Sequence, residues 1–253
     1  MTDQHTGVLA GRRALVTGAG SGIGRAVALG FAESGADLVL LSERDDLAPV
    51  AELAAASGVA VDCLRVDLRD VRARREAVGE LLARHAVHIL VNNAGQIRRA
   101  PAAEFSDADW LDVLDVNLHA AFDLSRSVGA SMLARGSGKI VNIASVLSFQ
   151  GGVFVPSYAA SKHALVGLTK ALANEWAGRG VNVNALAPGY ISTAVTSALR
   201  ADASRGNEIL ARIPAGRWGE PSDLVGPAVF LASSSADYVH GHVLAVDGGW
   251  LSR

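Results

Sequence analysis

The feature that most constrains the fold is a regular alternation of short apolar runs and longer helical patterns along the whole chain. The apolar runs cover 14–16, 38–41, 59–66, 87–91, 139–143, 181–186 and 242–246. The helical patterns cover about 23–34, 47–56, 71–85, 106–134, 158–177 and 221–232. Short strands that alternate with helices predict βαβ units and a parallel sheet covered on both faces.

A glycine-rich turn follows the first predicted strand and opens the first predicted helix. Its pattern is Gly18-x-x-x-Gly22-x-Gly24, which differs from the plain G-x-G-x-x-G fingerprint. Glycines allow the backbone to approach a phosphate closely, and a helix N-terminus offers it free N–H groups. A tight strand–helix turn alone would need the same residues, but its position favours dinucleotide binding. We therefore expect the α/β class: a single doubly wound Rossmann-type domain over 1–253, with about seven parallel strands.

The composition limits the cellular compartments and the classes of binding partner that we expect for this chain. The chain has 253 residues with one cysteine, Cys63, so no intrachain disulfide can form and a reducing compartment is expected. The net charge of −2 gives no reason to expect nucleic acid as a partner. No apolar run reaches the roughly 18 residues that cross a bilayer, and the polar start does not resemble a signal peptide. We expect a soluble, cytoplasmic protein that binds a small-molecule substrate.

The end of the second strand is expected to select the cofactor. Ser42 and Glu43 stand there, and an acidic residue can hold the ribose hydroxyls of NAD and repel a 2′-phosphate. Arg44 could instead serve the 2′-phosphate of NADP, so NAD is favoured and NADP is possible. Asp67 ends the third strand, where it could accept a hydrogen bond from the adenine amino group or cap the next helix.

Tyr158 and Lys162 lie four residues apart and therefore on one face of a helix. Ser145 closes an apolar run thirteen residues before the tyrosine. A nearby positive charge lowers a phenol's pKa, which would make Tyr158 a usable acid and base at neutral pH. The same spacing also suits a half-buried tyrosine beside a solvated lysine, and the other motifs decide between the two readings.

These motifs together resemble the short-chain dehydrogenase/reductase family over almost the whole chain. The matching residues are the glycine-rich turn with Thr17, Asn92-Asn93-Ala94-Gly95, Asn117, Ser145, Tyr158-x-x-x-Lys162 and Pro188-Gly189. The resemblance implies an NAD(P)-dependent oxidoreductase that interconverts a secondary alcohol and a ketone. It also implies a homotetramer.

The resemblance further implies a role for each matching residue. Tyr158 would be the general acid or base, Lys162 would lower its pKa and bind the nicotinamide ribose, and Ser145 would hold the substrate oxygen. Asn117 would anchor a proton-relaying water. The cofactor residues would be Gly18, Ser21, Gly22, Ile23, Gly24, Ser42, Glu43, Asp67, Leu68, Asn93, Ala94, Gly95, Tyr158, Lys162, Pro188, Gly189, Ile191 and Thr193.

Several stretches are similar to family members that act on deoxy sugar acids of the 2-deoxy-D-gluconate or 2-dehydro-3-deoxy-D-gluconate type. They include 92–99, 145–152 and 212–219. A sugar acid needs a cation for its carboxylate, and Arg98 and Arg99 follow the Asn-Asn-Ala-Gly turn. Gln150 and Ser145 are the candidates for hydroxyl contacts. Each arginine is also compatible with a surface or intersubunit position.

Other readings remain open. A 3-oxoacyl thioester reductase or a gluconate 5-dehydrogenase would use the same chemistry, and a dinucleotide-sensing protein would use the same fold. The irregular segment at about 192–219 is long for a structureless loop and predicts a substrate lid, or else a mobile insertion. His240 and His242 could face one side of a strand, but no third ligand is recognisable and no metal site is expected.

Overall fold

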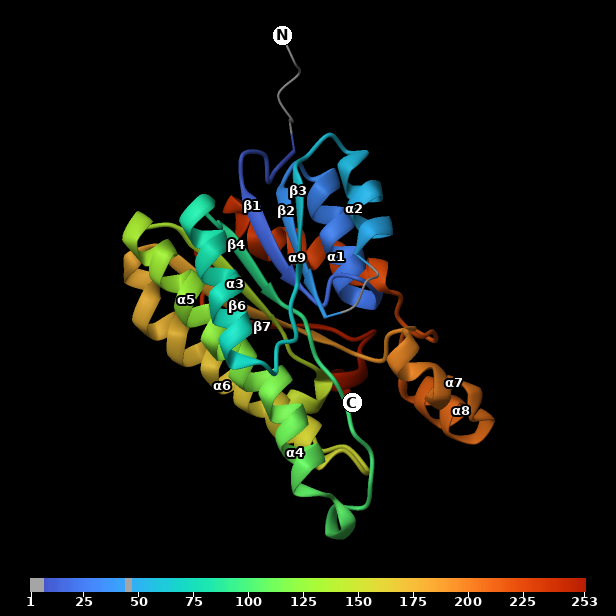
Figure 1. The fold of residues 1–253 in the computed structure, drawn as a ribbon. Coiled ribbons are helices and arrows are strands. Elements are labelled where there is room, and N and C mark those ends of the chain that lie inside the picture. Colours follow the sequence, from blue (N-terminus) through green and yellow to red (C-terminus); the bar gives the residue numbers. More distant parts are fainter. Residues whose placement is uncertain (1–6, 44–46) are drawn as a thin grey trace.

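The computed structural model describes residues 7–43 and 47–253 and contains one seven-stranded sheet. The strand order is β3-β2-β1-β4-β5-β6-β7, and every neighbouring pair is parallel. Helices cover both faces (Figure 1), so the predicted single doubly wound α/β domain is confirmed. Arg44, the alternative ligand for a 2′-phosphate, lies outside the described residues.

The central strands are buried on both faces and are correspondingly apolar, as parallel strands beneath two helix layers must be. The strands are β1 (Arg13–Thr17), β2 (Asp37–Ser42), β3 (Val61–Arg65), β4 (Ile89–Asn92), β5 (Gly138–Ile143), β6 (Val181–Pro188) and β7 (Val243–Val246). The edge strand β3 is largely exposed or half-buried, which explains its polar residues and the exposed Cys63.

The helices form two layers, one on each face of the sheet (Figure 1). One face carries α1 (Gly22–Glu33), α2 (Ala48–Ala55) and α9 (Val225–Ala232), and the other carries α3 (Val71–Arg84), α5 (Ala120–Arg135) and α6 (Pro156–Trp176). Two apolar clusters fill the space between these layers and the sheet, one around Val27 and Phe31 of α1, the other around Leu124 and Val128 of α5.

The long helical pattern at 106–134 divides into three parts. It contains α4 (Asp107–Leu114), a π-helical turn (Asp115–His119) and α5. Phe122 of α5 is 43% exposed. It lies two residues from the buried Leu124, which is about 200° around a helix, and therefore faces solvent.

The segment expected to form a lid contains two short helices of its own, α7 (Ser197–Ala201) and α8 (Ala203–Arg212). They project from the body of the molecule beside the carboxyl ends of the strands (Figure 1). Ile209 and Ile213 anchor this segment against Trp250 near the chain end. The segment is therefore attached to the domain through a small apolar cluster of its own.

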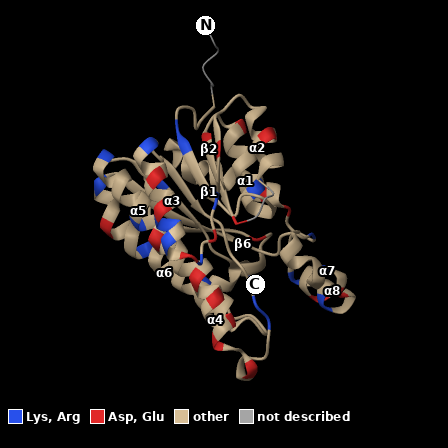
Figure 2. Cartoon of the chain, viewed as in Figure 1, with Lys and Arg blue, Asp and Glu red and all other residues tan. Residues whose placement is uncertain are grey.

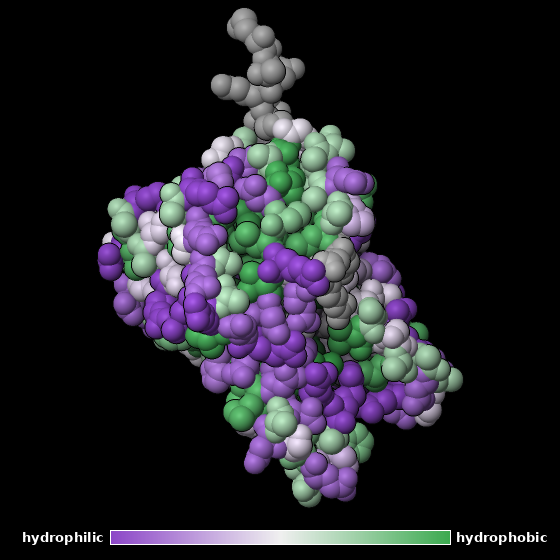
Figure 3. Space-filling model, viewed as in Figure 1, coloured by the Kyte–Doolittle hydropathy of each residue, from purple (hydrophilic) through white to green (hydrophobic). Residues whose placement is uncertain are grey.

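Charged residues belong mainly to the helices and loops, and the strands contain few of them (Figure 2). On the face shown in Figure 3, hydrophilic residues form a band across the middle of the molecule, with apolar residues above it. Within the described part of the chain, no helix combines the length and apolarity that a membrane span requires.

Candidate active site

A cleft of about 400 Å³ lies at the carboxyl ends of the strands. The strand order reverses between β1 and β4, where the connections leave in opposite directions, and doubly wound sheets open a crevice at such a point. The predicted residues that line the cleft are Gly18, Ser21, Gly22, Ile23, Ser42, Glu43, Asp67, Leu68, Asn93, Ala94, Gly95, Ser145, Tyr158, Lys162, Pro188, Gly189, Ile191 and Thr193. The topology thus brings together segments that lie as much as 175 residues apart in the sequence.

The glycine-rich turn has a geometry that only glycine satisfies. Gly18 and Gly22 have φ angles of +63° and +54°, and a Cβ on Gly24 would stand 2.2 Å from the Gly18 carbonyl oxygen. Helix α1 begins directly after this turn and has no acidic residue in its first turn. Its N–H groups and dipole are therefore suited to an anionic group, such as the pyrophosphate of a dinucleotide.

Asn93 and Thr17 hold the glycine-rich turn against the loop after β4. The Asn93 side-chain amide donates to the Thr17 and Gly18 carbonyls at 2.9 and 3.2 Å. The Thr17 hydroxyl accepts hydrogen bonds from the backbone N–H groups of Asn93 and Ala94 at 3.0 and 2.9 Å. These bonds fix the floor of the cleft. Gly24 does not line it and instead serves this close backbone packing.

Lys162 lies deep in the cleft on α6 and is 4% exposed. Its Nζ donates to the Ile143 carbonyl at 2.6 Å and lies 5.6 Å from the centroid of the Tyr158 ring. Burial disfavours the ammonium and lowers the pKa of Lys162 to about 8. The lysine is therefore mostly protonated at neutral pH, but a small rise in pH above neutrality deprotonates it.

Tyr158 lies one turn before Lys162 on the same helix and shares a hydrogen bond with the Ser145 side chain. Burial raises the pKa of the Tyr158 phenol, against the lowering effects of this hydrogen bond and of the Arg99 charge. The net rise of the Tyr158 pKa differs from the expected lowering, because burial of the phenol outweighs the groups that stabilise the phenolate. Ser145 caps a short turn, where its Oγ accepts from the Leu147 N–H at 3.1 Å.

Asn117 lies within the π-helical turn and is 1% exposed. Its amide nitrogen donates to the Gln96 carbonyl and the Ser161 hydroxyl, each at 3.1 Å, and its oxygen accepts from the Gln96 N–H at 2.9 Å. A Cβ built on Gly95 would lie 3.3 Å from the Asn117 oxygen and 3.7 Å from the Lys162 ammonium. Asn117 therefore ties the loop after β4 to α6 beside Lys162, although it does not itself line the cleft.

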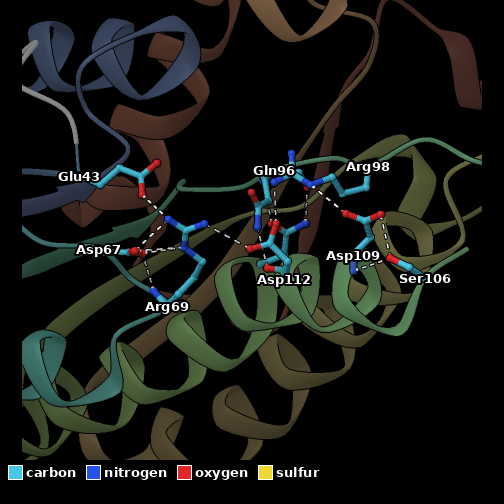
Figure 4. Close-up of polar contacts among 9 residues, drawn as sticks. Glu43, Asp67, Arg69, Gln96, Arg98, Ser106, Asp109 and Asp112 are labelled. Atoms are coloured by element: carbon cyan, nitrogen blue, oxygen red, sulfur yellow. Dashed lines mark hydrogen bonds and ion pairs between the residues drawn. The ribbon is translucent and has the colours of Figure 1, made fainter.

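The end of the cleft that is lined by Glu43 and Asp67, where the adenosine of a dinucleotide is expected, carries a group of ion pairs (Figure 4). The Asp67 carboxylate accepts from the Arg69 guanidinium at 2.8–3.1 Å, which holds the pKa of Asp67 below its usual range. Asp67 does not cap the next helix: Asp70 does, accepting from the Ala73 N–H at 3.0 Å. The capping alternative for Asp67 is therefore wrong, because the helix begins three residues later than that role requires.

The opposite end of the cleft is built by the segment after β6. The Gly189 N–H donates to the Val246 carbonyl at 3.0 Å, and a Cβ at Gly189 would stand 2.7 Å from the Asp247 Cα. Thr193 starts a capping box with Thr196, which shapes the rim. The Gly189 contacts and the Thr193–Thr196 capping box together fix the shape of this end of the cleft.

The three tentative substrate residues beyond Ser145 do not line the cleft. Arg98 is bound by Asp112 at 2.7 Å and by Asp109 at 3.5 Å. Arg99 is exposed, but its charge reaches Tyr158. Gln150 is half-buried, on the loop that leads to α6.

Several lining residues were not predicted from the sequence. They are Gly20, Leu41, Val66, Arg69, Gln96, Ile97, Val116, Ile143, Ala144, Ala194, Val195 and Thr196. Most of them adjoin a predicted residue, so adjacency to the motifs would have found them. Arg69 had a further signal, because it lies two residues beyond Asp67, the spacing of a local side-chain turn.

The cleft, together with the similarities given below, defines an NAD(P)-dependent oxidoreductase that acts on CH–OH groups. Residues 18–251 match the family model described as enoyl-(acyl carrier protein) reductase. The chain belongs to the short-chain dehydrogenase/reductase family.

Individual relatives are similar over nearly their whole length. The chain is 52% identical over 245 residues to 2-dehydro-3-deoxy-D-gluconate 5-dehydrogenase of Bacillus subtilis, covering 97% of this chain and 96% of that protein. A protein from Beutenbergia cavernae, described as an NAD(P)-dependent gluconate 5-dehydrogenase and solved with NADP, has a TM-score of 0.95 at 61% identity, covering 97% and 98% of the two chains. A gluconate 5-dehydrogenase from Burkholderia cenocepacia, solved with NADP and tartrate, has a TM-score of 0.93 at 43% identity, covering 97% of each chain.

Proposed function

We propose that this protein interconverts a secondary alcohol and a ketone on a deoxy sugar acid of the 2-dehydro-3-deoxy-D-gluconate type. The observation that carries the proposal is the convergence of Ser145, Tyr158 and Lys162 in a cleft whose glycine-rich floor suits a dinucleotide. The similarity to 2-dehydro-3-deoxy-D-gluconate 5-dehydrogenase from Bacillus subtilis supports the substrate class.

In the proposed reaction the protein handles the proton. The bound nicotinamide accepts or donates the hydride. Tyr158 takes the hydroxyl proton during oxidation and returns it during reduction, while Ser145 holds the same substrate oxygen. Lys162 supplies the positive charge that a tyrosinate needs, and Asn117 supports the proton path from its position beside Lys162.

Glu43 favours NAD at the adenosine end, because its carboxylate can accept from the ribose hydroxyls and repels a 2′-phosphate. Relatives solved with NADP support acceptance of the phosphorylated cofactor as well. We therefore propose that the protein uses NAD by preference and tolerates NADP.

Arg99 is the arginine that we propose for the substrate carboxylate. Arg98 is already neutralised by Asp112 and Asp109. Among the residues that the structure describes, Arg99 has no hydrogen bond or ion pair. Ile97, two residues before it, lines the cleft, and the Ala100 N–H after it donates to the Phe154 carbonyl at 3.1 Å, close to the start of α6. This bond holds the segment that carries Arg99 beside the mouth of the cleft.

Substitution of the two arginines separates their roles. For Arg99→Met we expect kcat/KM on the sugar acid to fall by about 100-fold, as loss of a charge-assisted contact predicts, with a smaller fall on a neutral amide of the same substrate. Arg98→Met is the matched control and should change the two substrates alike. Equal losses on the acid and the amide for Arg99→Met would contradict the assignment.

Gluconate 5-dehydrogenase activity is the second candidate, favoured by the two solved relatives of that description. We further propose a substrate lid at 192–219 and a homotetramer. A cytoplasmic location remains a prediction from the sequence. A 3-oxoacyl thioester reductase and a dinucleotide sensor are the remaining alternatives, and the substrate panel described next distinguishes them from the proposed function.

The test is the absorbance of reduced nicotinamide with purified protein and a panel of substrates. The panel contains 2-dehydro-3-deoxy-D-gluconate, 2-deoxy-D-gluconate, D-gluconate and a 3-oxoacyl thioester, each with NAD and NADP or their reduced forms. We expect the highest kcat/KM on a deoxy sugar acid with NAD. Highest activity on gluconate or the thioester would move the assignment to that alternative, and binding without any turnover would favour a sensor.

A further inference from the structure

Arg69 lies at the centre of the ion pairs at the adenosine end of the cleft (Figure 4). Its guanidinium binds three carboxylates: Asp67 at 2.8 Å, Glu43 at 3.1 Å and Asp112 at 3.4 Å. These three residues come from different segments, which follow β3, follow β2 and form α4, respectively. Arg69 also lines the cleft.

The contact with Glu43 bears directly on cofactor choice. With the ribose placed at Glu43 as proposed, the Glu43 carboxylate disfavours a 2′-phosphate by charge repulsion and by competition for the space beside the ribose. A guanidinium 3.1 Å from its carboxylate offsets much of that negative charge. A 2′-phosphate that approaches Glu43 therefore meets a carboxylate whose negative charge is partly offset by Arg69, although Asp67 and Asp112 share the same guanidinium.

Arg69 keeps its position without help from Glu43. Asp67 binds its Nε and Nη2, Asp112 binds its Nη1, and the backbone N–H of Arg69 also donates to Asp67 at 2.9 Å. The pKa of Arg69 is raised by Asp67 above all, so the group stays charged at every working pH. The cation is thus built into the rim, and its partner Glu43 is 48% exposed and free to turn toward a ribose.

We propose that Arg69 is a positioning residue that moderates the selectivity of Glu43 and so allows this protein to accept NADP as well as NAD. The proposal rests on the proposed placement of the adenosine ribose at Glu43. Removal of Arg69 would leave Glu43, Asp67 and Asp112 facing the cofactor with less compensating charge, which would disfavour the more anionic NADP. The protein would become more selective for NAD.

The test measures dissociation constants for NAD and NADP by calorimetry, so it does not depend on turnover. For Arg69→Met we expect NADP binding to weaken at least about tenfold while NAD binding changes less than about threefold. Arg69→Lys keeps the charge and should leave the NADP/NAD ratio within about threefold of that of the unaltered protein. Arg72→Met is the matched control, because in the described part of the chain Arg72 pairs only with Glu76, on the exposed face of α3.

A double-mutant cycle with Glu43→Gln shows whether Arg69 acts through Glu43. We expect the effect of Arg69→Met on the NADP/NAD ratio to fall to less than about threefold in the Glu43→Gln background. An unchanged ratio in Arg69→Met, or an equal effect in both backgrounds, would overturn the proposal. If the unaltered protein bound neither dinucleotide, the proposed function itself would fail. Normal binding with an unchanged NADP/NAD ratio in Arg69→Met would contradict only the proposed role of Arg69.

Discussion

At the scale of single residues, the electrostatics of the site depend on what each charged side chain contacts. Lys162 is buried and donates to the Ile143 carbonyl, and Arg98 is bound by carboxylates. The charge of Arg99 acts on Tyr158 by lowering the pKa of its phenol. The sequence presents Arg98 and Arg99 as equivalent neighbours. Their different environments arise because Asp109 and Asp112 on α4 reach one arginine and not the other.

Lys162 is expected to make stability depend on pH. Its pKa is about 8 in the folded protein and near its ordinary value of 10.5 in the unfolded chain, so the unfolded chain binds more protons between these values. The free energy of unfolding should therefore rise with pH from about 8 to 10. Lys162→Met should lack this rise and gain up to about 3 kcal/mol at pH 7 while losing activity. Urea unfolding of both proteins across this pH range measures the effect, and parallel curves would contradict it.

The residues proposed as catalytic could be predicted from the sequence because their spacing is local, whereas their electrostatic environment could not. Tyr158 and Lys162 share a helix face, which four residues of separation dictate. The direction of the Lys162 ammonium depends on the Ile143 carbonyl at the end of β5, and only the packed structure supplies that contact. For the same reason the network around Arg69 could not be predicted from sequence.

At the scale of elements, two departures from regular structure build the site. The π-helical turn at 115–119 carries Asn117 toward α6, and such turns often occur at functional positions. The glycine-rich turn brings the backbone of residues 18–24 against Asn93. Hydrophobic periodicity located the helices around both features but could not show the π-helical turn, which changes the hydrogen-bond pattern and not the composition.

Alanine substitutions at two glycines should have opposite effects. Gly24→Ala places a Cβ 2.2 Å from the Gly18 carbonyl oxygen, and we expect a loss of about 1–3 kcal/mol in unfolding free energy together with weaker dinucleotide binding. Gly79 lies on the exposed face of α3, and apart from its own stretch of helix no described residue has an atom within 4 Å of the new Cβ, so Gly79→Ala should gain about 0.5–1 kcal/mol. Thermal unfolding and calorimetry measure both. Unimpaired binding by Gly24→Ala would contradict the close packing of the turn.

At the scale of the whole molecule, the topology places the cleft where the strand order reverses, and one projecting segment borders it. Thr193 and residues 194–196 line the cleft, and α7 and α8 follow directly. The alternation of strands and helices predicted the parallel sheet, but the order of its strands follows from pairing across distant segments. The contact of the projecting segment with Trp250 is likewise a long-range packing result.

Limited proteolysis should report whether the proposed lid responds to the cofactor. Trypsin cleavage after Arg200 or Arg205 should slow on the order of tenfold at a dinucleotide concentration about ten times Kd, because binding opposes local opening of this segment. Cleavage after Arg179, which is exposed at the amino end of β6, serves as the control. Equal slowing at all three sites would indicate global stabilisation and no lid closure.

The most direct test of the account is the turnover of 2-dehydro-3-deoxy-D-gluconate with NAD by the unaltered protein and by Tyr158→Phe. We expect clear production of reduced nicotinamide by the unaltered protein. Tyr158→Phe should reduce kcat by at least about 1,000-fold, within the 10²–10⁴-fold contribution of a general acid or base, with NAD affinity changed less than about threefold. Comparable turnover by the two proteins would contradict the account.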